Sequence, residues 1–314
     1  MSVYRLLIFL PLVLLSSCFQ EKETFIPDTN PDDPAFLFSQ SLEKIQKFDI
    51  PITENTTYFT SDNTNFLKIP GGCLIDEAGN VFTGQATIEI FTMQSIGDLI
   101  AFGKIPYTLA GPVASQNLFY LNIKATGKNL TINPTLPIEW YSSTETSSNP
   151  YHLYYETVTE DQKKIWLSQF TSNYLPWSVK INENQITGYG CVFPITQEGW
   201  FVIGSPVSPS SAQITFPCLE GPSGFNRNNA IGFTIDKAGN TVIPLLFDET
   251  SKTFCNNIFG VAENSGIKFV LLSYQDDGQY YFGQLSTQVQ KDQTYRIDTK
   301  VTPLKEILST LRAL

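Results

Sequence analysis

Short runs of alternating apolar and polar residues fill the chain beyond residue 57, and turn-forming residues separate them. Alternation with a period of two is typical of β-strands that bury one face and leave the other face in water. Frequent Tyr, Phe and Thr also favour a pleated surface. The inward positions of two clear runs, 85–93 and 118–125, are Ala86, Ile88, Ile90, Thr92, Phe119, Leu121, Ile123 and Ala125. The pattern predicts an all-β fold.

A single amphipathic helix is predicted, at residues 303–314. Apolar residues recur there at helical spacing: Leu304, Ile307, Leu308, Leu311 and Leu314. Thr302 is suited to capping this helix, and Pro303 suits its first turn. Such a helix packs on a sheet or binds a partner, and we expect it to pack on the C-terminal β-domain. Residues 42–48 are compatible with one or two further helical turns.

A similar turn occurs once in each half of the chain, as Ile-Asp-Glu-Ala-Gly-Asn at 75–80 and Ile-Asp-Lys-Ala-Gly-Asn at 235–240. Asp accepts hydrogen bonds from nearby amides and Gly adopts positive φ, so we expect tight turns between strands. Calcium binding is the alternative, but the alternating oxygen ligands of an EF-hand loop are missing. One copy per half predicts two tandem β-sandwich domains, at 57–204 and 205–314.

The start of the chain has one cation, Arg5, followed by an apolar run over residues 6–15. This run is too short to span a bilayer, which needs about 18–20 residues. A charged start, a short apolar core and small residues before a cut site are typical of a secretory signal. The Leu-Ser-Ser-Cys sequence that ends at Cys18 resembles a bacterial lipoprotein signal. It implies that residues 1–17 are removed and that Cys18 is lipidated.

The residues that follow Cys18 are predicted to form a flexible tether over 18–56, because Pro removes hydrogen-bond donors and restricts its neighbours. Phe19 stands where an Asp would be the inner-membrane retention signal, which favours an outer-membrane lipid anchor. Gln-Glu-Lys-Glu at 20–23 is similar to the export tag of surface lipoproteins in the Bacteroidota. We expect exposure at the cell surface, with a periplasm-facing orientation as the alternative.

The stretch 66–88 carries a second resemblance, Ile-Pro-x-x-x-Leu-x-Asp-x-x-Gly followed by Thr-Gly-x-x-x-Ile. It resembles a β-sandwich module of uncharacterised Bacteroidota lipoproteins and is similar to carboxypeptidase regulatory-like, or transthyretin-like, sandwiches. Gly-Trp-Phe-Val at 199–202 looks like the junction to a second β-domain in such proteins. The chain then continues with Ile-Gly-Ser where the relatives have Asn and Asp. The resemblance implies no catalytic or ligand-binding residue.

Four cysteines remain in the expected mature chain. In an oxidising compartment we expect disulfides between Cys218 and Cys255 and between Cys73 and Cys191. The alternative is that they are buried free thiols, which pack as small apolar side chains. Their spacing is not the Cys-x-x-Cys of a zinc or redox site.

The chain is acidic, with 20 Lys and Arg against 30 Asp and Glu and a formal net charge of −10. We expect no binding to nucleic acid, whose phosphates require clustered cations. His152, the one histidine, lies in a predicted strand, and the common hydrolase, metalloprotease and nucleotide-binding motifs are missing. We therefore predict a non-enzymatic protein without catalytic residues, metal or cofactor. A hydrolase built on dispersed carboxylates is the alternative.

Four tryptophans, Trp140, Trp166, Trp177 and Trp200, are concentrated toward the end of the first predicted domain. Aromatic residues dominate binding hot spots, but they also fill cores. Trp166 and Trp177 flank a turn-rich stretch and are the expected exposed pair, facing an unknown protein or glycan ligand. We predict a binding or interaction module. The alternatives are a glycan- or peptide-capturing surface protein and a fimbrillin-like adhesin subunit, although a terminal helix is poorly suited to strand exchange.

Overall fold

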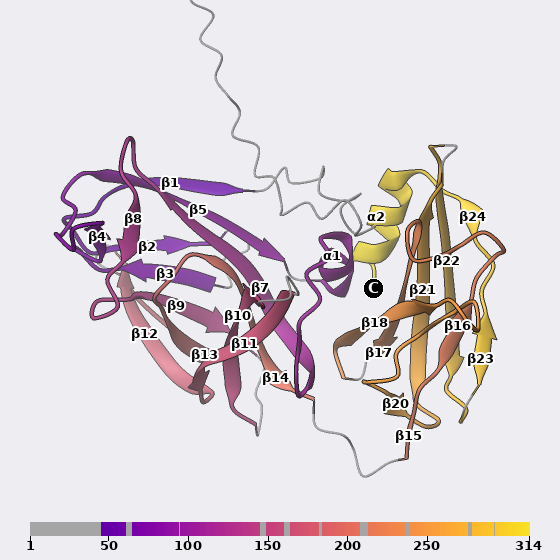
Figure 1. The fold of residues 1–314 in the computed structure, drawn as a ribbon. Coiled ribbons are helices and arrows are strands. Elements are labelled where there is room, and N and C mark those ends of the chain that lie inside the picture. The colour runs from indigo at the N-terminus through magenta and orange to yellow at the C-terminus, as the bar shows by residue number, and fades with distance from the viewer. Residues whose placement is uncertain are drawn as a thin grey trace, which may run out of the picture.

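The computed structural model describes residues 45–60, 65–93, 95–144, 149–159, 164–181, 184–207, 213–236, 239–275, 278–291 and 293–314. The expected signal peptide, Cys18 and the export tag lie outside these residues. The described part is mostly strand with two short helices (Figure 1), so the predicted all-β class is confirmed. No helix in this part is long and apolar enough to cross a bilayer.

Strands β1 to β14 form a sandwich of two antiparallel sheets. The large sheet has the order β1-β5-β7-β14-β10-β11, with β6 paired to β7, and the small sheet has the order β12-β13-β9-β3-β2. The strands of the large sheet are β1 Gln46–Pro51, β5 Gln85–Met93, β6 Tyr107–Thr108, β7 Gly111–Lys124, β10 Tyr151–Val158, β11 Lys164–Ser172 and β14 Gly199–Pro206. Those of the small sheet are β2 Thr56–Phe59, β3 Asn65–Ile69, β9 Ile138–Ser143, β12 Leu175–Ile181 and β13 Asn184–Ile195. A separate pair, β4 Leu74–Asp76 and β8 Leu130–Ile132, closes one end.

The core between the two sheets is built from the inward positions that the alternation predicts. Ala86, Ile88, Ile90, Phe119, Leu121 and Ile123 are all buried in it. Trp140 of the small sheet stacks on Phe119 of the large sheet, with ring centroids 3.7 Å apart. Burying a large apolar side chain contributes roughly 1.5–3 kcal/mol, so this core holds the sandwich together.

The large sheet begins inside the segment that we expected to be a tether. Residues 46–51 form β1, which pairs with β5 over its whole length. Phe48, Ile50 and Ile52 fall on alternating positions and pack into the core, and Lys47 Nζ lies 2.8 Å from Glu89 Oε1. This burial outweighs the effect of Pro51 at the strand end. The expectations of a tether over 18–56 and of helical turns over 42–48 are therefore wrong for residues 46–51, which form a strand.

Strands β15 to β24 form a second unit with its own core. Its main sheet has the order β23-β16-β19-β18-β17-β21-β22-β24, and β15 pairs with β20. Tyr295 in β23 lies 5.2 Å from Phe269 in β21, measured between ring centroids, so the sheet curls over one core. The strands are β15 Ile214–Thr215, β16 Cys218–Glu220, β17 Ala230–Asp236, β18 Thr241–Asp248, β19 Thr253–Cys255, β20 Val261–Ala262, β21 Gly266–Tyr274, β22 Tyr280–Gln288, β23 Thr294–Arg296 and β24 Lys300–Val301. Because β14 ends at Pro206, the first unit continues two residues past the predicted boundary at 204.

The two units meet in a shared hydrophobic cluster that the sequence did not predict. It joins the outer face of the large sheet to the second unit and includes both helices, α1 (Ile96–Ala101) and α2 (Leu304–Arg312), which lie side by side between the units (Figure 1). The buried members are Phe91, Met93, Leu99, Ile100, Ala101, Phe102, Ile105, Val113, Leu118, Tyr154, Trp166, Trp200 and Val202 from the first unit, and Phe233, Ile235, Val242, Val270, Leu272, Phe282, Ile307 and Leu311 from the second. The predicted C-terminal helix therefore forms, but it packs between the units and not on the second unit alone.

Polar contacts also cross this interface. Arg312 Nε donates to Asp98 Oδ1 at 3.1 Å, and Asn240 Nδ2 donates to the backbone oxygen of Ser115. Ser95 caps α1, because its Oγ accepts a hydrogen bond from the Asp98 N–H at 3.0 Å. The interface thus combines apolar burial with contacts that fix the position of α1 against α2.

Candidate functional site

The two tryptophans that we expected to form an exposed pair lie apart. Trp166 is only 3% exposed and belongs to the cluster between the units, because its face of β11 is covered there. Trp177 is half-buried on the outer face of the small sheet, where its ring centroid lies 5.0 Å from that of Phe66 and 6.0 Å from that of Tyr141. The expectation of an exposed Trp166–Trp177 pair is therefore wrong, and both side chains are used for packing.

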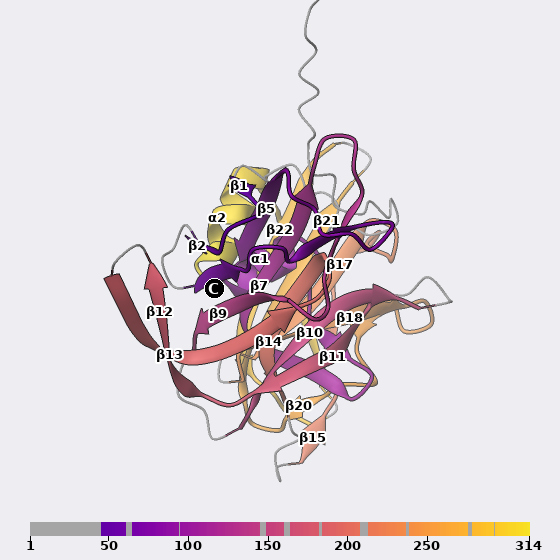
Figure 2. The ribbon, with the colours of Figure 1, turned by 90° about the vertical axis from the view of Figure 1, so that its left-hand side faces the viewer.

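Trp177 belongs to the hairpin of β12 and β13, which stands out from the body of the first unit (Figure 2). It pairs with Gly188, and its ring covers that glycine so closely that a Cβ there would lie 2.4 Å from the indole Cζ2. An aromatic ring that covers a cross-strand glycine fills the space that the missing side chain leaves. One face of the hairpin thus continues the packed outer face of the small sheet.

The opposite face of the hairpin is uncovered. Tyr174 and Tyr189 lie on it with ring centroids 6.0 Å apart and planes inclined by 17°, and Tyr189 is 61% exposed. Pro176, Ser178, Gln185 and Thr187 share the face, because they occupy the same alternating positions of the paired strands, and all four are exposed. We call these six residues the tyrosine face. Gln185 Nε2 donates to Ser178 Oγ at 2.8 Å.

The tyrosine face extends the inner side of the small sheet beyond the point where the large sheet covers it. Cys191, further along β13, is still buried in the core, and its Sγ lies 3.7 Å from the Asn173 carbonyl oxygen at the end of β11. Residues 184–189 precede that point, and among the described residues no sheet packs over this side, where Gln185, Thr187 and Tyr189 are exposed. An aromatic pair that stabilises no core is a candidate contact surface.

Only part of this surface could be predicted from the sequence. Tyr174 and Tyr189 are separated by 15 residues in the chain, and only the hairpin register of Pro176 with Tyr189 brings them together. In the structure, exposed and half-buried residues alternate over 185–189, and this alternation distinguishes the two faces. The tryptophans were misleading as signs of a contact surface, because Trp166 and Trp177 both pack against other side chains.

His152 lies on β10, and its contacts are to the neighbouring strand. Its Nδ1 lies 3.2 Å from Ser168 Oγ and 3.1 Å from Thr171 Oγ1, and burial lowers its pKa. The imidazole is held between these two hydroxyls across the strand pair. These contacts suit an ordinary strand residue.

The two similar segments at 75–80 and 235–240 form tight turns, as predicted. Asp76 Oδ1 accepts hydrogen bonds from the backbone N–H groups of Ala78 and Asn80, at 3.0 and 2.9 Å, and Gly79 has a φ of +81°. In the second copy the Gly239 N–H donates to Asp236 Oδ1 at 3.2 Å. In the part of the chain that the structure describes, no group of three or more His, Cys, Asp or Glu side chains is arranged to hold a metal ion.

A polar hollow of about 910 Å³ lies at the end of the large sheet, where Asp49, Lys124, Lys128 and Glu198 are among its lining residues. Desolvation raises the pKa of Glu198 to about 7. The residue is nevertheless exposed overall, so solvent screening limits this effect. Opposite charges line the hollow, and we assign it no chemistry.

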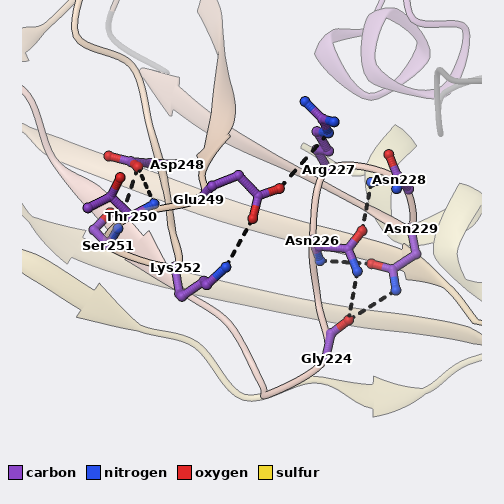
Figure 3. Close-up of polar contacts among 10 residues, drawn as sticks. All are labelled: Gly224, Asn226, Arg227, Asn228, Asn229, Asp248, Glu249, Thr250, Ser251 and Lys252. Carbon is purple, nitrogen blue, oxygen red and sulfur yellow. Dashed lines mark hydrogen bonds and ion pairs between the residues drawn. The ribbon is translucent and has the colours of Figure 1, made fainter.

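Figure 3 shows a second polar cluster, on loops of the second unit. Glu249 lies 3.0 Å from Lys252 Nζ and 3.9 Å from Arg227 Nε, while Asn226 and Asn229 both donate to the Gly224 carbonyl oxygen. Apart from the Arg227–Glu249 contact, which joins the two loops, these contacts lie within a single loop. They define turn shape, and exposed pairs of this kind contribute at most about 1 kcal/mol.

The cysteines follow the expectation for one pair only. Cys218 and Cys255 form a disulfide across β16 and β19 that links positions 37 residues apart, worth about 3–4 kcal/mol in the chain-entropy model. Cys73 and Cys191 are free and buried in the core of the first unit, so the second expected disulfide is not formed. Burial raises the pKa of the Cys73 thiol to about 11, which keeps it protonated and inert.

No protein-family model matches the chain, and no curated protein matches it significantly.

Proposed function

We propose that this chain is a lipid-anchored protein of a bacterial outer membrane, of the kind found in the Bacteroidota, and that it acts as a non-enzymatic binding module. The observation that carries the binding role is the tyrosine face. It presents two neighbouring aromatic rings and short polar side chains on a projecting hairpin, and it is not used for packing the sandwich. Tyr is enriched at binding surfaces because it offers a large rigid contact area and a polar tip.

The proposed location rests on the lipoprotein-like sequence that ends at Cys18. The Cys218–Cys255 disulfide supports it, because disulfides persist in oxidising compartments outside the cytoplasm. The position of α2 counts against a pilin-like role. A donor strand must be extended and free to pair with another subunit, whereas residues 304–312 are helical and packed between the two units.

Replacing Cys18 by Ala should move the protein from the membrane fraction to the soluble fraction, because a single site of lipidation is proposed to hold it. Fractionation of cells, followed by immunoblotting, measures this. Protease digestion of intact and lysed cells then separates surface exposure from a periplasm-facing orientation. Membrane retention of the Cys18→Ala protein would contradict the proposed anchor.

The binding role is tested on the soluble Cys18→Ala protein. We expect the further double substitution Tyr174→Ser and Tyr189→Ser to abolish retention on an immobilised panel of neutral glycans, acidic glycans and peptides, because both rings of the tyrosine face are lost. Tyr274→Ser is the matched control, since Tyr274 is 38% exposed and pairs with Tyr280 in the second unit at 4.9 Å between ring centroids. Equal retention of the double variant, or no retention of the unsubstituted protein, would contradict the role.

A further inference from the structure

We infer that the tyrosine face binds a neutral polysaccharide; this inference rests on the proposed binding role of the hairpin. The face has six described side chains: two Tyr, one Pro, one Ser, one Thr and one Gln. None of these six side chains carries a charge, and the one basic or acidic residue at the same alternating positions is Lys180, the register partner of Gln185 toward the end of the hairpin. Their chemistry is aromatic and hydroxyl- or amide-bearing, and both kinds of group match the surface of a sugar ring.

The aromatic part of the face suits the apolar side of a pyranose. Tyr174 and Tyr189 lie with nearly parallel rings whose centroids are 6.0 Å apart, and Tyr189 is largely exposed. Aromatic rings attract the partly positive hydrogens of C–H groups through their negative faces. Two adjacent sugar units offer such C–H faces at regular spacing, so a chain lying across the hairpin contacts both rings.

The polar part of the face suits sugar hydroxyls. Gln185 and Ser178 are joined by a hydrogen bond of 2.8 Å, and Thr187 stands opposite Ser178 in the strand register. Amide and hydroxyl groups both donate and accept hydrogen bonds, as sugar hydroxyls do. The existing Gln185–Ser178 contact holds the two side chains in place before a ligand arrives, which reduces the entropy lost on binding.

Two features argue against other ligands. Pro176 lies in β12, the edge strand of the small sheet, and a proline there cannot donate a backbone hydrogen bond to an added peptide strand. The net charge of −10 repels acidic polymers, since it leaves a negative field around the protein. A neutral glycan requires neither strand pairing nor charge.

The test uses affinity gel electrophoresis of the Cys18→Ala protein in gels that contain dextran, mannan, starch, xyloglucan or mixed-linkage β-glucan, with alginate and heparin as acidic polymers. We expect at least one neutral polysaccharide to retard the protein. Tyr189→Ser and Tyr174→Ser should each weaken that binding about tenfold or more. Tyr189→Phe, which keeps the ring, should retain most of it, and Tyr274→Ser should bind as the unsubstituted protein does.

Other results would overturn the inference. Retardation by the acidic polymers alone, or equal retardation of all variants, contradicts a neutral glycan site on this face. Retention on peptides only, lost when Tyr174 and Tyr189 become Ser, would overturn the glycan inference and leave the proposed binding role standing. Loss of fold is checked by circular dichroism, and Tyr189 is exposed enough for its replacement to leave the core intact.

Discussion

Replacing Gly97 by Ala is expected to destabilise the protein by about 1–3 kcal/mol, the range of overpacking substitutions. Alanine alone would favour helix α1 by roughly 0.5–1 kcal/mol over glycine. The added Cβ, however, would lie 1.9 Å from the Leu311 oxygen and 2.1 Å from the Leu311 carbonyl carbon in α2. Both atoms belong to the backbone, so one helix must move. Urea denaturation measures the loss in the free energy of unfolding.

The same substitution should loosen the contact between the two units. Displacing α2 removes Ile307 and Leu311 from their buried positions and breaks the Arg312–Asp98 ion pair, so we expect faster trypsin cleavage at Lys305 and Arg312. Gly266→Ala is the matched control, because a Cβ at Gly266 meets nothing within 4 Å. Equal stability and equal cleavage rates for the Gly97→Ala and Gly266→Ala proteins would show that α1 and α2 are not closely packed.

Replacing Lys104 by Ala should lower the free energy of unfolding by about 3–5 kcal/mol, as expected when one partner of a buried ion pair is removed. Lys104 Nζ lies 2.5 Å from Glu156 Oε2, and the two side chains are only 3% and 12% exposed. The ammonium also lies 4.8 Å from the centre of the Trp200 ring. The truncation leaves the Glu156 carboxylate buried without this partner. Thermal and urea denaturation measure the effect.

A double variant distinguishes the buried charge from lost packing. Lys104→Met combined with Glu156→Leu removes both charges and keeps apolar volume, and it should be clearly more stable than Lys104→Ala. The exposed Lys252–Glu249 pair is the control, with an N···O distance of 3.0 Å and side chains that are 68% and 56% exposed. Lys252→Ala should change stability by less than about 1 kcal/mol. If Lys104→Ala lowered the free energy of unfolding no more than Lys252→Ala does, the expected contribution of the buried Lys104–Glu156 pair would be contradicted.

Local alternation predicted the sandwich because it records which face of a strand meets the core. The inward residues of β5 and β7 lie where the period of two places them. The helix at α2 was predicted from its apolar spacing in the same way. Shorter or interrupted signals failed: α1 has only six residues, and its Ser95–Asp98 capping pair was the one clue. β1 was missed because Pro51 and the preceding Pro-rich stretch hid the alternation of Phe48, Ile50 and Ile52.

The contact between the units could not be derived from alternation alone, although the sequence contains a trace of it. Trp-Phe-Val-Ile at 200–203 and Leu-Phe-Tyr-Leu at 118–121 are continuous apolar runs, and such runs indicate strands covered on both faces. They do not say what covers the second face. For the same reason Trp166 could be placed on a strand but not assigned to solvent or to an interface. The tyrosine face depends on a pairing register, which local patterns leave open.

The pairing of α1 with α2 also sets an order of events during synthesis. Asp98 and Arg312 are separated by 214 positions, so at about 5–20 residues per second α1 exists for roughly ten seconds or longer before α2 is made. Val202 is made 110 positions before Arg312, so for roughly the last five seconds or longer of that time the outer face of the large sheet, with Phe91, Met93, Trp166 and Val202, lacks its contact with α2. A nascent or partly exported chain therefore exposes an apolar surface that is prone to aggregate. We expect chaperones to bind this protein until α2 is made and packs into the interface.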